Sequence, residues 1–136
     1  MSAVNKRVVA GLLAAAASTA LVGSTVVPAS AADTQLKVQA IIPLTGALAF
    51  LAPPEIAGLH LAVDEINAAG GVLGKKVSLT ITDSGDGDTL SIADQSATKA
   101  IASGADVVIG AAASGVTRSI INKITGAKIV EISMSN

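Results

Sequence analysis

EIAGLHLAVDEINAAGGVLG, residues 55–74, predicts an amphipathic helix that ends abruptly on two glycines. Up to Asn67, its apolar residues recur at the three- and four-residue spacing of a buried helical stripe. Gly70 and Gly71 then stop the helix, because a residue without a Cβ readily adopts the left-handed conformation that closes a helix C-terminus. A strand with alternating apolar residues follows at 76–82, so the stretch opens an α/β unit. The stripe consists of Ile56, Leu59, Val63 and Ile66.

The rest of the chain continues this alternation of strands and helices with short polar joints. Helices that connect successive strands in this way imply right-handed crossovers and a parallel sheet. The predicted fold class is therefore α/β, with a parallel, doubly wound sheet. Strands are expected at 36–43, 76–82, 106–111 and 128–133. The first helix is expected from Pro53-Pro54 to Asn67. The second is expected over 89–103, with Asp88 as N-cap, Gly104 as stop, and Leu90, Ala93, Ala97 and Ile101 facing inward. The third is expected over 114–125, with Gly126 as stop.

The first 31 residues have the composition of an export signal. Lys6 and Arg7 form a positive start, residues 8–27 are apolar, and Ala29-Ser30-Ala31 offers the small residues that a signal peptidase reads. We expect cleavage after Ala31 and an exported protein, periplasmic or extracellular, that comprises residues 32–136. The alternative is an uncleaved membrane anchor, since about 20 apolar residues can span a bilayer.

Charge and composition narrow the function classes. The chain has 9 Lys and Arg and 10 Asp and Glu; without Lys6 and Arg7 the balance becomes 7 against 10, a net charge of −3. This balance gives no support to nucleic-acid or anionic-membrane binding. The absence of cysteine excludes disulfides and thiol catalysis. Phe50 is the only aromatic residue, which is unusual for a complete binding protein and, with an end directly after the fourth strand, suggests a truncated chain.

The sequence gives little support to a catalytic or metal-binding function. His60 is the only histidine and lies off the apolar stripe, so we expect it on the surface. The acidic turn at 83–88 lacks the ligand order of a calcium loop. Ser114 lacks the G-x-S-x-G context of a hydrolase nucleophile. The spacing of the glycines does not match a nucleotide-binding motif. We therefore expect no catalytic residue, metal or cofactor, and no enzyme.

The doubly wound sheet itself points to a binding edge, because ligands bind beyond the C-terminal ends of its strands. This rule selects the loops at 43–47, 110–115 and 133–136. Ser114 starts a predicted helix, where free amides and the helix dipole attract an anion such as a carboxylate. The alternative is that Ser114 only caps that helix.

Four segments carry a resemblance to a known family. Together they resemble the N-terminal part of a periplasmic branched-chain amino-acid-binding protein, of the Leu/Ile/Val-binding family that serves ABC importers. The resemblance implies the type I periplasmic-binding fold, a two-lobed clamshell that closes on an amino acid and delivers it to membrane permease components. The specific part is DEINAAGGVLGKK. The segments are IIPLTGALA (41–49), GLHLAVDEINAAGGVLGKKVSLTITDS (58–84), DVVIGAAASGVT (106–117) and EISMSN (131–136).

The resemblance also implies roles for individual residues. Ser114 matches the serine that holds the ligand carboxylate, and the backbone of Ala112 and Ala113 would line the same site. Ser135 and Asn136 match the start of a loop that supplies a carbonyl and a hydroxyl to the ligand amino group.

In the first loop, a family position that is often aromatic aligns near Phe50 or Leu51. Residues 32–136 would then be part of lobe 1, without the second lobe and hinge, so weak or no binding is expected. Relatives bind amino acids, amides or urea, and the sequence leaves that choice open. Two other interpretations also remain: a sensory ectodomain of the same fold on an uncleaved anchor, and a truncated product that does not bind.

Overall fold

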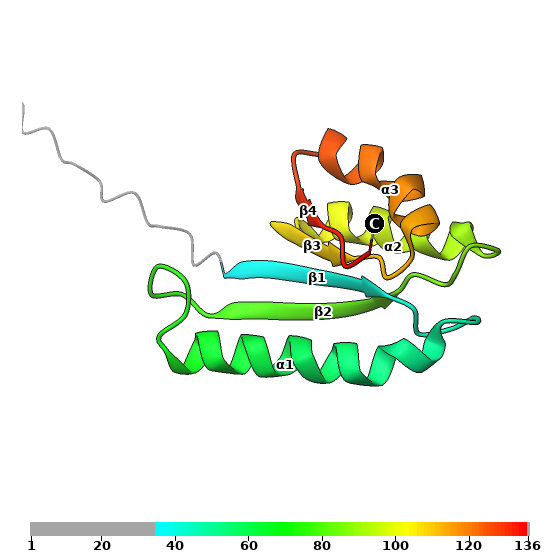
Figure 1. The fold of residues 1–136 in the computed structure, drawn as a ribbon. Coiled ribbons are helices and arrows are strands. Elements are labelled where there is room, and N and C mark those ends of the chain that lie inside the picture. Colours follow the sequence, from blue (N-terminus) through cyan, green and yellow to red (C-terminus); the bar gives the residue numbers. More distant parts are fainter. Residues whose placement is uncertain (1–34, 136) are drawn as a thin grey trace, which may run out of the picture. The chain divides into compact units, whose positions relative to one another are not determined.

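The computed structural model describes residues 35–135 (Figure 1). The expected signal segment, its cleavage site after Ala31, and Asn136 lie outside these residues. The order of strands and helices is the predicted one, with ends shifted by one or two residues. The elements are β1 (Leu36–Ile42), the short 3-10 helix η1 (Ala49–Leu51), α1 (Ala52–Ala68), β2 (Val77–Asp83), α2 (Leu90–Ser103), β3 (Val107–Gly110), α3 (Ser114–Gly126) and β4 (Val130–Ile132).

The four strands form one parallel sheet in the order β2-β1-β3-β4. Helix α1 covers one face of the sheet, and α2 and α3 cover the other (Figure 1). The chain leaves β1 toward β2 on one side and returns to β3 on the other, so the strand order reverses between β1 and β3. This reversal confirms the doubly wound α/β class and defines a switch point at the C-terminal ends of those strands.

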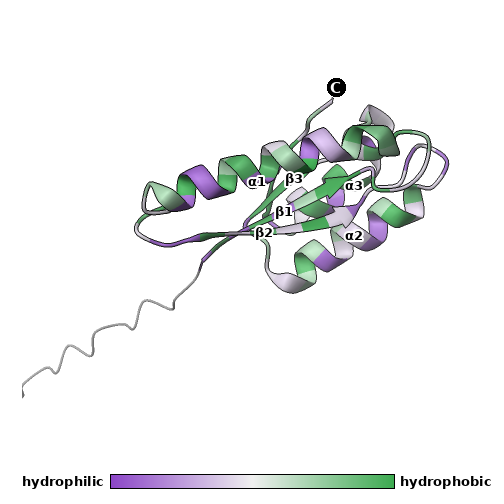
Figure 2. Ribbon diagram, turned by 90° about the horizontal axis from the view of Figure 1, so that it is seen from below, coloured by the Kyte–Doolittle hydropathy of each residue, from purple (hydrophilic) through white to green (hydrophobic). Residues whose placement is uncertain are grey.

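Each face of the sheet has its own core. On the α2/α3 face, small residues of α2 let that helix approach the sheet closely, and branched residues of α3 fill the remaining space. On the α1 face, Ile56 and Leu59 pack against Ala40 and Ile42, whereas Ile66 is 40% exposed. Figure 2 shows hydrophobic strands between helices of mixed polarity. The α2/α3 core includes Ile41, Ala93, Ala97, Ala100, Val108, Val116, Ile120 and Ile124, all fully buried.

Two helices close on glycines in the left-handed conformation, as predicted, and the third closes on a different residue. At the end of α1, the Gly71 amide donates to the Ile66 carbonyl at 2.8 Å, and both Gly70 and Gly71 have positive φ. Helix α2 ends in the same way at Gly104. In α3, Gly126 is the last helical residue, but Lys128 adopts the left-handed conformation at φ 66.

Helix α3 thus ends at Gly126 as expected, but the left-handed residue that closes its C-terminus is Lys128, two positions later. Ile124 and Ile129 are both buried, and the Ile129 amide donates to the Ile124 carbonyl at 3.3 Å. Packing both side chains places the turn at Lys128, where a residue with a Cβ accepts a conformational cost of about 1–2 kcal/mol. The expectation that Leu90 faces the core is wrong, because Leu90 is the first residue of α2 and its side chain is 41% exposed.

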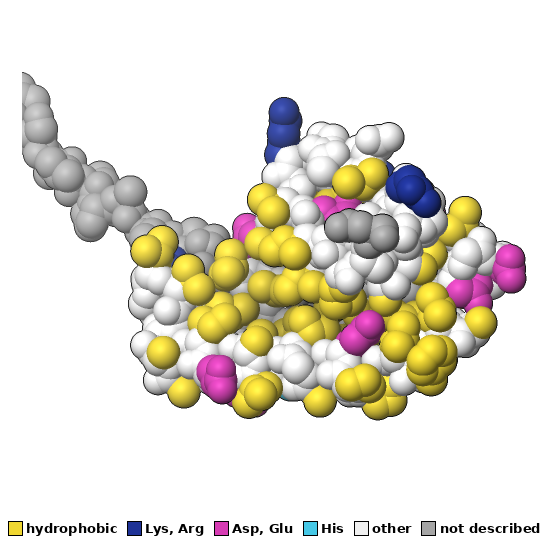
Figure 3. Space-filling model, viewed as in Figure 1, with side chains coloured by type: hydrophobic (Ala, Val, Ile, Leu, Met, Phe, Trp, Pro, Cys, Tyr) yellow, Lys and Arg dark blue, Asp and Glu magenta, His cyan; other side chains and the backbone are white. Residues whose placement is uncertain are grey.

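In the described part of the chain, no helix lies over one part of the sheet. In register, Val107 pairs with Val130 and Ile109 with Ile132, so these four side chains share the face opposite α2 and α3. Val130 and Ile132 are 58% and 53% exposed. Figure 3 shows hydrophobic side chains gathered above α1 on this side of the molecule. Within residues 35–135, no helix combines the length and the apolar character needed to cross a bilayer.

Candidate functional site

A hollow of about 270 Å³ lies where β3 and β4 end and α3 begins. It is near the small end of the usual range for small-molecule sites, about 300–1,000 Å³. Two of the predicted site residues, Ser114 and Ser135, line it together, although they are 21 positions apart in the chain. Four of the six lining residues carry a hydroxyl group, and one is a cation. The lining residues are Ser114, Thr117, Arg118, Ile121, Ser133 and Ser135.

Ser114 is available for a ligand in this hollow. It is the first residue of α3; the N-cap is Ala113, in an extended conformation, and no side chain caps the helix. Within the described part of the chain, the Ser114 hydroxyl has no hydrogen-bond partner. The interpretation of Ser114 as a helix cap is therefore wrong. The first amides of a helix also lack intrahelical acceptors, so this end of α3 presents several donors to an anionic group.

A hydroxyl network joins the two loops that flank the hollow. Thr117 Oγ1 accepts a hydrogen bond from the Ala111 amide at 3.2 Å and lies 3.3 Å from Ser133 Oγ. Ser133 Oγ accepts from the Ser135 amide at 3.2 Å and donates to the Ser135 carbonyl. Ser135 Oγ in turn donates to the Ala111 carbonyl at 3.3 Å. The end of β3 and the loop after β4 are thus held together by side chains.

Ala112 and Ala113 lie between the end of β3 and Ser114 and are half-buried. Their path depends on Gly110, which has φ 135 and runs close to β1. A Cβ at Gly110 would lie 2.1 Å from the carbonyl oxygen of Ile41, so a larger residue there requires the backbone to move. Glycine at this position lets the end of β3 lie against the end of β1.

The first loop is held by Asp83 at the end of β2. The Asp83 carboxylate accepts the amides of Leu44 at 2.9 Å and Gly85 at 2.8 Å. It also accepts both the amide and the hydroxyl of Thr45, at 3.2 and 2.5 Å. Burial raises the pKa of Asp83, but these hydrogen bonds outweigh burial and leave the pKa below its ordinary value.

Asp86 makes a second tie between the same two loops. Its carboxylate accepts the amide of Ala47 at 2.8 Å, and the Thr89 hydroxyl and the Asp88 amide at 3.0 Å each. These hydrogen bonds lower the pKa of Asp86. Asp88 was expected to be the N-cap of α2, but that cap is Thr89, and no side chain caps the helix. The expectation failed because Asp86 already organises the turn.

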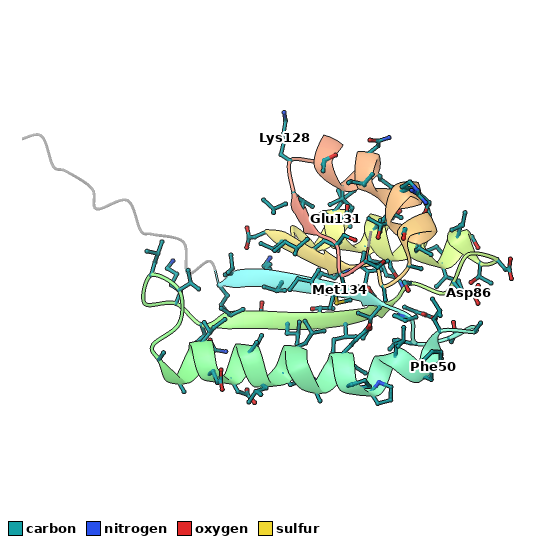
Figure 4. The ribbon with its side chains drawn as sticks, viewed as in Figure 1. Phe50, Asp86, Lys128, Glu131 and Met134 are labelled. Atoms are coloured by element: carbon teal, nitrogen blue, oxygen red, sulfur yellow. The ribbon has the colours of Figure 1, made fainter. Side chains whose placement is uncertain are left out.

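Phe50 and Leu51 lie in η1, at the start of α1 (Figure 4). Phe50 is 71% exposed, and neither residue lines the hollow beside Ser114. The structure therefore brings Ser114 and Ser135 together and leaves the first loop apart from them. Asn136 lies outside the described residues. A ligand role for Phe50, Leu51 and Asn136 stays a prediction.

Three residues of the hollow, all on α3, were missed from the sequence. Thr117, Arg118 and Ile121 lie three, four and seven positions after Ser114, which places them on the same side of the helix. Ser133 directly follows β4 and lies in the loop at 133–136 that the edge rule selected. Helical spacing from Ser114 could have found the other three.

Other features of the structure are weaker candidates for a functional site. A hollow of about 300 Å³ lies at the opposite end of the sheet, lined in part by Leu36, Leu73 and Asp106. Parallel sheets of this kind bind ligands at the other end of their strands, so this hollow is a poor candidate. His60 is exposed on α1, as expected. Within residues 35–135, no group of three or more His, Cys, Asp or Glu side chains is arranged to hold a metal.

Comparison with known proteins identifies the family of this chain. The sequence pattern of the periplasmic binding protein family matches residues 35–136. The chain belongs to the periplasmic binding protein family. The predicted resemblance to the Leu/Ile/Val-binding proteins is confirmed by "Leu/Ile/Val-binding protein homolog 8" of Brucella abortus, which is 44% identical over 75 residues. That match covers 55% of this chain and 18% of the relative.

Solved structures give the same result for the fold of this family member. A branched-chain amino acid transporter substrate binding protein from Streptococcus pneumoniae, in complex with isoleucine, is 33% identical with a TM-score of 0.69. The match covers 75% of this chain and 29% of that one. A leucine binding protein from Thermotoga maritima has a TM-score of 0.66 over 74% of this chain and 29% of its own; at 24% identity it shows the fold alone. The chain thus spans under a third of these proteins and under a fifth of the Brucella relative.

Proposed function

We propose that this chain is part of an extracytoplasmic solute-binding protein that binds a branched-chain or related amino acid for an ABC importer. The observation that carries the proposal is the unpaired hydroxyl of Ser114 at the start of α3, beside the hydroxyl-lined hollow. An amino acid offers a carboxylate, which matches free helix amides and a hydroxyl donor. Arg118 on the same wall adds a favourable charge. Permease components of the importer are the proposed membrane partners.

The family relationship supports this choice of ligand. The Streptococcus pneumoniae structure was solved with isoleucine, and the Brucella relatives are described as Leu/Ile/Val-binding protein homologs. The resemblance implies a clamshell whose two lobes close on the ligand. A single lobe lacks the opposing contacts and the exclusion of water, so the affinity of this chain alone is expected to be weak.

An NMR titration with leucine, isoleucine and valine tests the proposal, because chemical shifts report binding in the millimolar range. Ligand-induced shifts are expected at Ser114 and the amides that follow it. Ser114→Ala should weaken binding by about 1–3 kcal/mol through the loss of a hydrogen bond to a charged group. Ser91→Ala, at an exposed site on α2, is the matched control. Unchanged affinity in Ser114→Ala would refute the role of Ser114, and the absence of shifts with every amino acid would refute the proposed ligand class.

We also propose export with cleavage after Ala31. The family relationship and the composition of residues 1–31 support this proposal. Mass spectrometry of the protein recovered from cells tests it. A mature N-terminus at Ala32 is the expected result, whereas an intact N-terminus in the membrane fraction would favour the anchored alternative.

A further inference from the structure

We infer that Thr117 is a positioning residue of this site, whose hydroxyl sets the placement of Ser114 relative to Ser135. The inference rests on the proposed function, since it concerns how the two sides of the same hollow are held for a ligand. Thr117 acts through the backbone of Ala111 and through Ser133, and its role differs from that of Ser114, whose hydroxyl is free.

Thr117 is suited to this role by its place in the fold. It lies on the first turn of α3, three residues after Ser114, and is only 7% exposed. Its Oγ1 accepts the Ala111 amide at 3.2 Å and lies 3.3 Å from the Ala111 carbonyl oxygen. Ala111 is itself fully buried, so no solvent replaces the hydrogen bond of its amide if the hydroxyl is removed. Thr117 therefore fixes the segment that leads from β3 into Ser114.

The same hydroxyl also reaches the opposite wall. Ser133 Oγ accepts the Ser135 amide and donates its proton to the Ser135 carbonyl, so Thr117 Oγ1 is the donor to Ser133 Oγ, 3.3 Å away. Ser135 Oγ closes the ring by donating to the Ala111 carbonyl at 3.3 Å. Thr117, Ser133, Ser135 and Ala111 thus form a closed hydrogen-bonded ring across the two loops. In such a ring the loss of one member weakens the others.

A ring of this kind pre-organises a site. The loop after β4 has no helix or strand pairing to hold it within residues 35–135; Ser133 and Ser135 place it through side chains. Without the Thr117 hydroxyl, both loops must be ordered when the ligand binds, and that ordering lowers affinity. Thr117→Val keeps the shape and the β-branch and removes only the hydroxyl. Thr117→Ser keeps the hydroxyl and loses only the methyl group.

Two measurements on the full chain separate positioning from direct ligand contact. Hydrogen exchange of the Ala111 amide, recorded without ligand, reports the ring itself. NMR titration with leucine reports affinity. Thr117→Val should speed Ala111 exchange and weaken leucine binding, each about tenfold, which corresponds to about 1.4 kcal/mol. Thr117→Ser, and the control Thr125→Val at an exposed position of the same helix, should stay within about twofold of wild type for both measurements.

Wild-type exchange at Ala111 in Thr117→Val would overturn the inference, because the hydroxyl would then hold nothing in place. Unchanged exchange with weaker binding would show a direct contact instead and would equally overturn it. If Thr117→Val does not fold, Ser133→Ala decides: it should weaken leucine binding several-fold, and wild-type affinity there would overturn the inference. If wild type binds no amino acid, the proposed function fails, and the Ala111 exchange rate alone decides whether Thr117 holds the loops.

Discussion

The side-chain amide of Asn67, in the last turn of α1, pairs with the backbone of Val77, the first residue of β2. Asn67 Oδ1 accepts the Val77 amide at 2.7 Å, and Nδ2 donates to the Val77 carbonyl at 3.0 Å. The amide thus bonds Val77 as a neighbouring strand would. Val77 is buried and β2 is an edge strand, so this pair determines where the strand begins.

Replacing Asn67 by alanine should destabilise the protein by about 1–3 kcal/mol, because both backbone groups of Val77 lose their partner. Asn67→Asp keeps the acceptor oxygen and loses the donor. Its loss of stability should lie between that of wild type and that of Asn67→Ala, or exceed the latter if the carboxylate repels the Val77 carbonyl. Urea denaturation measures these changes. Asn122→Ala, at an exposed site of α3, is the control and should change stability by less than about 0.5 kcal/mol. Equal stability of Asn67→Ala and Asn122→Ala would contradict the role of Asn67.

The two glycines after α1 should differ in their tolerance of alanine. Both have positive φ, 104 at Gly70 and 78 at Gly71, so alanine should cost about 1–2 kcal/mol at either position. A Cβ at Gly71 would also lie 2.0 Å from the carbonyl oxygen of Lys75, whereas a Cβ at Gly70 meets nothing within 4 Å. Gly71→Ala should therefore lower the melting temperature clearly more than Gly70→Ala. Equal losses would show that the contact with Lys75 relaxes freely.

Asp83 should support the fold at neutral pH and lose that role in acid. Its folded pKa is lowered, so its contribution is present above the unfolded value of about 3.9 and disappears as the pH falls through the folded pKa. Asp83→Asn should lose about 1–3 kcal/mol at pH 7, since a neutral amide accepts the amides of Leu44 and Gly85 less strongly. Urea denaturation between pH 7 and pH 2.5 should show this difference shrinking below about pH 4. Asp88→Asn, at a neighbouring exposed carboxylate, is the control; a difference independent of pH would contradict the prediction.

Glu131 should have the opposite pH dependence. It pairs in register with Val108, so its side chain lies on the α2/α3 side, where both carboxylate oxygens are buried without a hydrogen-bond partner among residues 35–135. Burial raises the pKa of Glu131. The folded state then binds the proton more tightly, so this group favours folding below about pH 4.3 and opposes it as the pH rises through the folded pKa.

Glu131→Gln should therefore stabilise the protein at pH 7, by about 0.5–1 kcal/mol because the residue is only half-buried. The gain should vanish below about pH 4, where wild-type Glu131 carries its proton. Thermal melts at pH 7 and pH 3.5 measure both values. Glu65→Gln, on the exposed face of α1, should show no such gain. A loss of stability in Glu131→Gln at pH 7 would mean that the carboxylate has a partner in solution.

The order and type of the elements could be predicted because periodicity and glycine stops are local properties. Gly70, Gly71 and Gly104 end their helices as expected. Lys128 could not be predicted as the closing residue of α3, since its conformation follows from the packing of Ile124 and Ile129. The pairing of Asn67 with Val77 could not be predicted either, since the turn between the two residues determines which backbone group Asn67 reaches.

For the site, the edge rule selected the loops of Ser114 and Ser135, which line the same hollow. It could not reveal the hydroxyl ring, because Thr117 and Ser133 come together only when α3 packs beside β4. Nor could it show that Phe50 stands apart from the hollow, since the path of the first loop depends on the hydrogen bonds to Asp83 and Asp86. Long-range side-chain contacts carry no local signal in one sequence.

The strand order has a consequence for how this chain folds. The central strand β1 is the first to be synthesised, yet Leu36 pairs with Val77, about 40 residues later, and Val38 pairs with Val107, about 70 residues later. Neither neighbour exists while the N-terminal third of the chain emerges. Because closing such long loops precedes any gain from pairing, β1 has no neighbour on either edge until β2 has emerged, and none on its second edge until β3 has emerged. The strand at the centre of the sheet is therefore made first and is completed only late in synthesis.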